Sequence, residues 1–214
     1  TYMNALTLSF KRPASAAGLT LMGLLFMAVM LFSPVSQAKE AKAIFAGGCF
    51  WCMEPPFDNL DGVISTISGY TDGHKKNPTY REVSAGVTGH TEAVEVTYDP
   101  DIVSYQTLLD VFWVNVDPFA INRQFCDTGT QYRSGIYPID DEQMRLATAS
   151  KEKVQQDFDK KIQTEIKPAS TFYPAEDYHQ DYYMKNPIRY TFYRNSCGRD
   201  NRLKEVWGDQ FKKY

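Results

Sequence analysis

The architecture is set out in residues 42–70, KAIFAGGCFWCMEPPFDNLDGVISTISGY. Lys42 to Ala46 is a short apolar run typical of a buried strand, and it is closed by two glycines. Residues 49–60 predict a helix that is broken or bent near Pro55-Pro56, and residues 62–70 predict a second strand. This order predicts a βαβ opening.

The remainder of the chain alternates between short strands and helices. The predicted elements are strands at 91–98, 135–139 and 164–169, a helix capped by Ser104 and a long polar helix from Asp140 to about Lys160. An aromatic, helical tail follows. This alternation, without a long parallel run, predicts an α+β fold: a two-layer α/β sandwich with a ferredoxin-like βαβ core and an irregular C-terminal tail.

The front of the chain has the pattern of a signal peptide. Met3 is followed by Lys11-Arg12, an apolar run from Leu19 to Phe32 and a small-residue site at Ser36-Gln37-Ala38. The run is shorter than the roughly 18 apolar residues of a spanning helix, so export with cleavage after Ala38 is favoured over an anchor. Residues 1–38 are therefore predicted to be the signal peptide and residues 39–214 one domain, in the periplasm of a Gram-negative host.

Charge and cysteine content narrow the classes of function. The chain has 214 residues, a net charge of −3 and no basic patch, so a nucleic-acid partner is not expected. Four cysteines, Cys49, Cys52, Cys126 and Cys197, could form structural disulfides in an exported protein. The mature part is large and apolar enough to fold without disulfides, which favours a redox function for the cysteines. No metal is expected, because Cys49 and Cys52 lack a second closely spaced pair.

Two residues have a chemical role that follows from their position. Cys49 lies at the start of a predicted helix, where unpaired N–H groups favour the thiolate, which is the nucleophile. Glu92 shares a strand face with Val94, Val96 and Tyr98, so it is expected to be buried. Burial raises a carboxyl pKa and makes the group a proton donor. The alternative is a strand-end glutamate in water.

Six motifs in order cover nearly everything after the leader and resemble one family. They are Gly47-Gly48-Cys49-Phe50-Trp51, Ser68-Gly69-Tyr70, Asn77-Pro78-Thr79-Tyr80, Gly89-His90-Thr91-Glu92-Ala93-Val94, Gly129-Thr130-Gln131-Tyr132-Arg133-Ser134 and Glu176-Asp177-Tyr178-His179-Gln180. Their series resembles the peptide-methionine (S)-S-oxide reductases, the A-type methionine sulfoxide reductases. The resemblance implies that residues 39–214 are a single catalytic domain of that kind.

The resemblance also implies roles for seven residues. Cys49 would attack the sulfoxide sulfur, Glu92 would protonate the departing oxygen, Tyr80 and Tyr132 would hydrogen-bond that oxygen, Asp127 would support the site, and Phe50 and Trp51 would hold the substrate S-methyl. No cofactor is needed. Methionine-S-sulfoxide, free or in proteins, would be reduced through a Cys49 sulfenic acid and an intramolecular disulfide, repairing oxidised proteins. A thioredoxin-like dithiol would regenerate the enzyme, which we expect to be monomeric.

The sequence leaves the resolving thiol open. Best-known family members carry it soon after an Asn-Pro in a Gly-rich tail, whereas Asn186-Pro187 here has no Cys until Cys197. Cys197 is the first candidate, because Gly198 could let the tail swing; Cys52, in a CxxC with Cys49, is the second, and Cys126 the third.

Two alternatives to the main function remain: a general CxxC dithiol-disulfide oxidoreductase and a membrane-anchored binding module. His90 and His179 are expected to be structural hydrogen-bonders.

Overall fold

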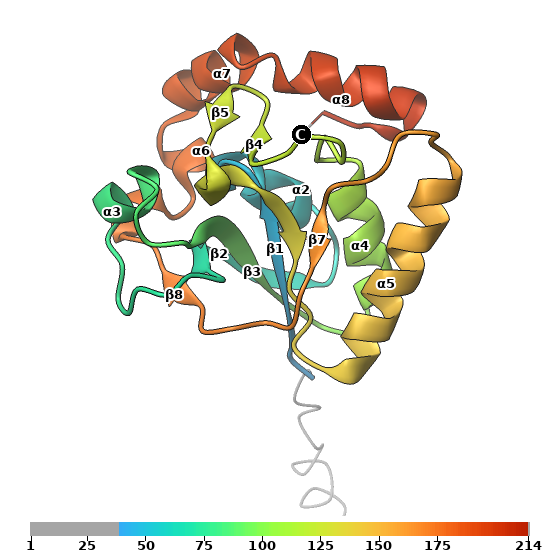
Figure 1. Ribbon diagram of the computed structural model, residues 1–214. Helices are drawn as coiled ribbons and strands as arrows, with labels where there is room; N and C mark the ends of the chain where they lie inside the picture. Colours follow the sequence, from blue (N-terminus) through green and yellow to red (C-terminus); the bar gives the residue numbers. More distant parts are fainter. Residues whose placement is uncertain (1–38, 214) are drawn as a thin grey trace, which may run out of the picture. The chain divides into compact units, whose positions relative to one another are not determined.

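The computed structural model describes residues 39–213 of the chain (Figure 1). The predicted signal peptide, residues 1–38, lies outside the described residues and stays a prediction. Among the described helices, none combines the length and apolar character needed to cross a membrane.

A six-stranded mixed sheet is the centre of the fold, in the order β7-β6-β1-β3-β2-β8. Its strands are β1 (Ala41–Gly47), β2 (Val63–Thr71), β3 (Thr91–Tyr98), β6 (Ser134–Ile136), β7 (Glu165–Ile166) and β8 (Tyr173–Pro174). β1 and β2 both pair antiparallel with β3, so they run parallel to each other, as a βαβ opening requires. β6 pairs antiparallel with β1, which completes the ferredoxin-like order of the four central strands. The predicted α+β class is confirmed.

The helices lie mainly on one face of the sheet and along the top of the domain in Figure 1. They are α2 (Glu54–Asp58), α3 (Tyr80–Ser84), α4 (Tyr105–Trp113), α5 (Asp141–Gln156), α6 (Tyr182–Lys185), α7 (Pro187–Ser196) and α8 (Arg199–Trp207), with 3-10 turns η1 (Phe50–Cys52), η2 (Thr130–Tyr132), η3 (Asp177–His179) and η4 (Gly208–Gln210). A small hairpin, β4 (Arg123–Gln124) with β5 (Asp127–Thr128), occupies the long loop after α4.

Two predicted helix starts are confirmed by their caps. The Ser104 side chain accepts a hydrogen bond from the Thr107 N–H at 3.1 Å, and Asp140 accepts one from the Gln143 N–H at 2.7 Å. The C-terminal segment is more regular than the predicted irregular tail. It forms α7 and α8, with Gly198 at φ +66° between them.

The predicted bend of the first helix near Pro55-Pro56 is wrong in its position. The 3-10 turn η1 ends at Cys52 and α2 begins at Glu54, so the break lies at Met53, before the prolines. Both prolines lie in the first turn of α2. Proline fits there because the N–H that it lacks would have no partner within the helix.

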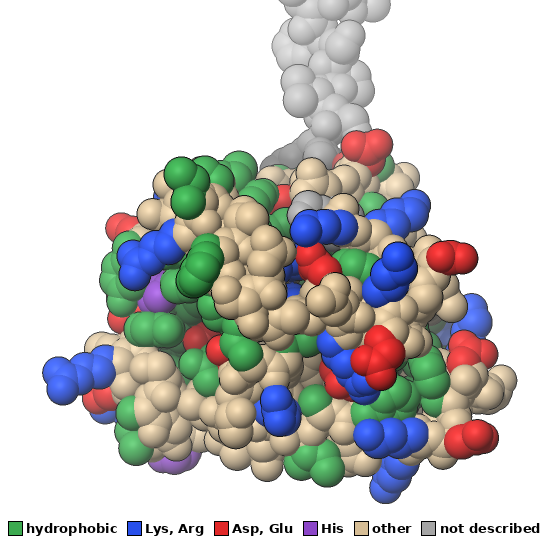
Figure 2. All heavy atoms as spheres, turned by 90° about the horizontal axis from the view of Figure 1, so that it is seen from above, with side chains coloured by type: hydrophobic (Ala, Val, Ile, Leu, Met, Phe, Trp, Pro, Cys, Tyr) green, Lys and Arg blue, Asp and Glu red, His purple; other side chains and the backbone are tan. Residues whose placement is uncertain are grey.

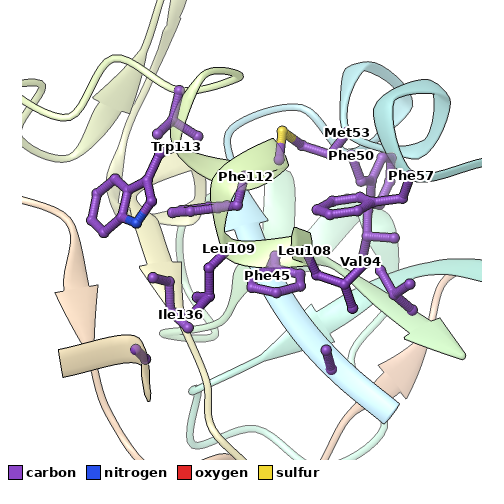
Figure 3. Close-up of a cluster of buried hydrophobic side chains, with 14 of the residues drawn as sticks. Phe45, Phe50, Met53, Phe57, Val94, Leu108, Leu109, Phe112, Trp113 and Ile136 are labelled. Carbon is purple, nitrogen blue, oxygen red and sulfur yellow. The ribbon is translucent and has the colours of Figure 1, made fainter. Parts of the chain in front are cut away.

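The main core lies between the sheet and helices α2 and α4 (Figure 3). Phe45 of β1 stacks on Phe57 of α2 and Phe112 of α4, with ring centroids 5.1 and 5.4 Å apart. Each such buried side chain contributes about 1.5–3 kcal/mol relative to an exposed one. Ile44, next to Phe45, points to the opposite face and packs near Tyr137 in a second, smaller cluster. β1 is therefore buried on both sides, which fixes the strand end that leads into Cys49.

Gly48 makes the turn from β1 into η1 possible. Its φ of +81° is a backbone conformation that side chains rarely adopt, and an added Cβ would lie 2.5 Å from the Gln124 Cβ. The chain can therefore reverse tightly against the β4 hairpin. Phe45 of β1 pairs with Val94 of β3, which places the start of β3, with Glu92, beside this turn.

Candidate active site

One small cavity of about 70 Å³ opens at the end of β1. It is lined by Cys49, Phe50, Trp51, Tyr80, Glu92, Asp127, Tyr132 and Tyr193. The first seven are the residues that sequence analysis assigned to the site, and they come from four separate segments of the chain. Tyr193 is the addition.

Cys49 forms the floor of the cavity, directly before η1. Its side chain is only 6% exposed, and the following turn is closed by a hydrogen bond from the Cys52 N–H to the Cys49 carbonyl at 3.0 Å. The expectation that this position favours the thiolate is wrong for the free protein. Burial raises the pKa of Cys49, and the charges of Cys52 and Glu92 raise it further. A three-residue turn has too small a dipole to reverse this.

Cys52 is the more acidic thiol of the pair. A hydrogen bond from the Cys49 thiol lowers the pKa of Cys52 to about 6, and the guanidinium groups of Arg199 and Arg194 lower it as well. Arg199 is itself buried and donates to the Gly47 carbonyl at 3.2 Å, so its charge is fixed beside the end of β1. Burial therefore disfavours ionisation of Cys49, whereas its neighbours favour ionisation of Cys52.

Glu92 faces Cys49 from the start of β3. It is 2% exposed and accepts a hydrogen bond from the Phe50 N–H at 3.1 Å. Burial raises the pKa of Glu92 to about 8, and this hydrogen bond lowers it only in part. The predicted burial is confirmed. At neutral pH the carboxyl group keeps its proton and can donate it.

Two phenols and a carboxyl group complete the polar wall. Tyr80 begins α3, and its backbone N–H donates to Glu176 Oε1 at 2.9 Å, which ties the start of this helix to η3. Burial raises the pKa of Tyr80 and of Tyr132, so both hydroxyls remain donors. Asp127, in β5, accepts a hydrogen bond from the Tyr193 hydroxyl.

Aromatic rings form the remaining wall of the cavity. The Trp51 Nε1–H donates to His179 Nδ1 at 3.0 Å, and the Trp51 ring stacks on Tyr182 at 3.7 Å between centroids. Burial lowers the pKa of His179 to about 4, so the ring stays neutral and accepts this bond. The structural role predicted for His179 is confirmed. His90 likewise hydrogen-bonds the Lys75 carbonyl at 2.7 Å.

Tyr193 lines the cavity but was not predicted from the sequence. This residue lies on α7, and burial raises its pKa, so its hydroxyl keeps the proton that it donates to Asp127. In the sequence, Tyr190 and Tyr193 are aromatic residues at helical spacing, a pattern that also describes a helix face packed in the core. Only the tertiary fold shows that one of the two reaches the cavity.

The cysteines form two pairs. Cys126 and Cys197 form a disulfide with 4.9 Å between their Cα atoms, whereas Cys49 and Cys52 are free thiols. The first candidate for the resolving thiol, Cys197, is therefore bonded to the third, Cys126. The second candidate, Cys52, is the thiol in contact with Cys49. Among the described residues, Cys126, Asp127 and Cys197 also form a group with metal-ligand atoms, but both of its sulfurs are in the bond.

Comparisons with known proteins agree with this arrangement of residues. Residues 41–211 match the family described as peptide methionine sulfoxide reductase. The peptide methionine sulfoxide reductase MsrA of Bacillus pumilus is 52% identical over 174 residues, covering 80% of this chain and 98% of the relative. That of Bacillus subtilis is 47% identical over 176 residues, covering 81% and 99%.

Solved structures show the same likeness. Mxr1 from Saccharomyces cerevisiae in reduced form superposes with a TM-score of 0.67 at 35% identity, covering 71% of this chain and 88% of that one. Methionine sulfoxide reductase A of Corynebacterium diphtheriae gives a TM-score of 0.64 at 37% identity, covering 72% and 78%. Because the family match spans nearly all of the described residues and 52% of the aligned positions are identical in a relative covered over 98% of its length, the chain belongs to the peptide methionine sulfoxide reductase family and is an oxidoreductase.

Proposed function

We propose that this protein reduces methionine-S-sulfoxide, free or within proteins, to methionine, with Cys49 as the nucleophile. The observation that carries the proposal is that the Cys49 thiol and the protonated Glu92 line one cavity. Thiol and acid are the two groups that sulfoxide reduction requires, because the oxygen departs easily only once it is protonated.

In the first step Cys49 gives its proton to the Cys52 thiolate and its sulfur attacks the sulfoxide sulfur. Cys52 suits this acceptor role because it lies in the same turn as Cys49 and its pKa is the lower of the two. Glu92 protonates the oxygen, which transfers to the Cys49 sulfur. The products are methionine and a Cys49 sulfenic acid, so the substrate sulfur is reduced by two electrons and Cys49 is oxidised by two.

The cavity walls orient the substrate. The hydroxyls of Tyr80 and Tyr132 are donors on the polar side, where the sulfoxide oxygen would lie, and Asp127 supports that side through Tyr193. Phe50 and Trp51 form the apolar side, which suits the S-methyl group. A sulfoxide is chiral at sulfur, so fixing oxygen and methyl on opposite sides selects one epimer. The family resemblance makes this the S epimer.

Cys52 is the proposed resolving thiol. It contacts Cys49, and two buried arginines favour its thiolate. Its attack on the sulfenic acid releases water and forms a Cys49–Cys52 disulfide, which an external thioredoxin-like dithiol then reduces. Cys197 fits this step less well because it is bonded to Cys126.

We further propose that the protein is exported, to the periplasm in a Gram-negative host, and acts as a monomer. The leader pattern of residues 1–38 supports export. So does the Cys126–Cys197 disulfide, because such bonds persist in oxidising compartments. Fractionation of the host cell, followed by light scattering of the purified protein, tests the two statements separately.

The function is tested with purified protein, dithiothreitol and the separate epimers of a methionine sulfoxide ester. The S epimer should be reduced and the R epimer should not, and Cys49→Ser should be inactive. Lack of reduction of the S epimer by the wild-type protein would defeat the proposal. Cys52→Ser should still turn over once, whereas a general CxxC oxidoreductase would lose all activity.

A further inference from the structure

Glu54 is a buried carboxyl group that the proposed reaction does not use. It is the first residue of α2, two positions after Cys52, and it is fully buried. It does not line the catalytic cavity, so it takes no direct part in the chemistry. Burial raises the pKa of Glu54 to about 7. Because burying a carboxyl group costs free energy, its place in the fold needs a physical reason.

The Glu54 side chain joins the sheet to the residue before α6. Its Oε1 accepts a hydrogen bond from the Ser68 hydroxyl, in β2, at 2.9 Å and another from the Asp181 N–H at 3.3 Å. Asp181 directly precedes α6 and has a φ of +52°, a left-handed conformation that residues other than glycine seldom adopt. The hydrogen bond from Asp181 to Glu54 therefore helps to hold a strained residue in place.

The residues on either side of this strained position hold Trp51. Before it, His179 Nδ1 accepts the hydrogen bond from the Trp51 Nε1–H, and after it, the Tyr182 ring stacks on the Trp51 ring. His179 ends η3 and Tyr182 begins α6, so the backbone conformation at Asp181 sets where one lies relative to the other. Trp51 in turn forms part of the apolar wall of the catalytic cavity.

This wall lies near the surface of the molecule. Met184 of α6 and Ile188 and Phe192 of α7 are exposed, so these two helices pack on one side only. Figure 2 looks down on this part of the surface, where hydrophobic side chains gather on the left, over α7. Packing on one side constrains a helix less than burial within a core does. The hydrogen bonds that tie this layer to the sheet therefore help to set its position.

We propose that Glu54 is a positioning residue that determines how closely the apolar wall of the cavity fits the S-methyl group of the substrate. Tied to β2, Glu54 fixes the turn at Asp181, and this turn places His179 and Tyr182 against Trp51. The inference rests on the proposed function, in which Trp51 faces the S-methyl group. Without Glu54 the wall would be looser and would admit a larger group on the sulfur.

The fit of the wall is tested with the S epimer of methionine sulfoxide and its S-ethyl analogue, with dithiothreitol as reductant. One methylene in an apolar pocket changes kcat/KM about ten-fold or more. Glu54→Ala should lower the ratio of kcat/KM for the methyl over the ethyl substrate about ten-fold, whereas Glu54→Gln, which keeps the acceptor oxygen, should preserve it. Tyr183→Phe is the matched control: it removes a hydrogen bond between α6 and Asp58 of α2, and Tyr183 does not line the cavity. An unchanged ratio in Glu54→Ala, or an equal fall in Tyr183→Phe, would overturn the proposal.

A second measurement, independent of activity, is an NMR titration of the His179 ring, whose signals are identified by their loss in His179→Gln. In Glu54→Ala, water should reach the ring, and the pKa of His179 should rise from about 4 toward its ordinary value of about 6.5. In Glu54→Gln and Tyr183→Phe it should stay low. An unchanged pKa of His179 in Glu54→Ala would overturn the proposal, whether or not the wild type reduces a sulfoxide. If Glu54→Ala does not fold, Glu54→Asp, whose carboxyl group is one methylene shorter, takes its place in both tests.

Discussion

Glu92 can act as a proton donor because its carboxyl group is buried and not in contact with water. The hydrogen bond from the Phe50 N–H stabilises its carboxylate, but the loss of solvent outweighs that bond, and the pKa rises to about 8. Because the folded protein holds this proton more tightly than the unfolded chain, the contribution of Glu92 to stability is present at low pH. It is lost as the pH rises toward 8.

Glu92→Gln should lower kcat/KM about 10²- to 10³-fold at pH 7, because an amide cannot protonate the departing oxygen. In the wild type, kcat/KM should fall as the pH rises through about 8. The measurement is a pH–rate profile with the S epimer and dithiothreitol. Glu95→Gln is the matched control, since Glu95 lies three residues along β3 and pairs with Lys42. Equal kcat/KM values for Glu92→Gln and the wild type would contradict the role of Glu92 as the acid.

Tyr193→Phe should lower kcat/KM about ten-fold, because it removes the hydrogen bond from the Tyr193 hydroxyl to the half-buried carboxyl group of Asp127. The ring would still fill its place. Tyr183→Phe provides the control: its hydroxyl donates to Asp58 at 3.0 Å, and it does not line the cavity. The comparison uses the same sulfoxide assay. An equal loss of kcat/KM in both variants would mean that the effect comes from general destabilisation of the fold and not from the cavity.

At the scale of single residues, the sequence predicted the burial and the raised pKa of Glu92 but not the raised pKa of Cys49. Glu92 could be placed by its phase within β3, a local property. The acidity of Cys52 depends on Arg194 and Arg199, which are more than 140 residues away along the chain. Tyr193 contacts Asp127 across 66 residues of the chain, so periodicity within α7 could not reveal that contact.

Among the elements, the turn between β1 and η1 positions the Cys49 thiol in the cavity. Gly48→Ala should lower the free energy of unfolding by about 3 kcal/mol, through backbone strain and contact with Gln124. Gly198→Ala isolates the strain alone: Gly198 also has a positive φ, but a Cβ there would meet nothing within 4 Å, so a loss of about 1 kcal/mol is expected. Urea unfolding measures both. Equal losses would show that contact with Gln124 is unimportant.

The elements were predictable in proportion to their length and local signals. β1, β2, β3, α4 and α5 have periodic patterns or caps and were found. β7 and β8 have two residues each: β7 lies within the strand predicted at 164–169, whereas β8, at the opposite edge of the sheet, was not predicted. The break at Met53 was missed because proline is compatible with both a bend and a helix start, and the sequence does not choose between the two.

On the scale of the whole molecule, the Cys126–Cys197 bond joins the β4 hairpin to the end of α7 across 71 residues. Replacing both cysteines by serine should lower the free energy of unfolding by about 4 kcal/mol relative to the oxidised wild type, since a closed loop of this length restricts the unfolded chain. Urea unfolding with and without dithiothreitol measures it. Under reducing conditions the variant and the wild type should coincide, and a persistent gap would point to altered packing instead.

The size of the catalytic cavity sets a limit on what can be repaired. About 70 Å³ is the space of roughly two water molecules, so only the tip of an oxidised methionine fits, and its peptide backbone must lie outside. We expect oxidised client proteins to be restored faster in urea-loosened form than in native form, at equal sulfoxide content, as measured by methionine recovery. The enzyme would then select damaged proteins without a separate recognition site, because partial unfolding alone makes an oxidised methionine accessible to the cavity.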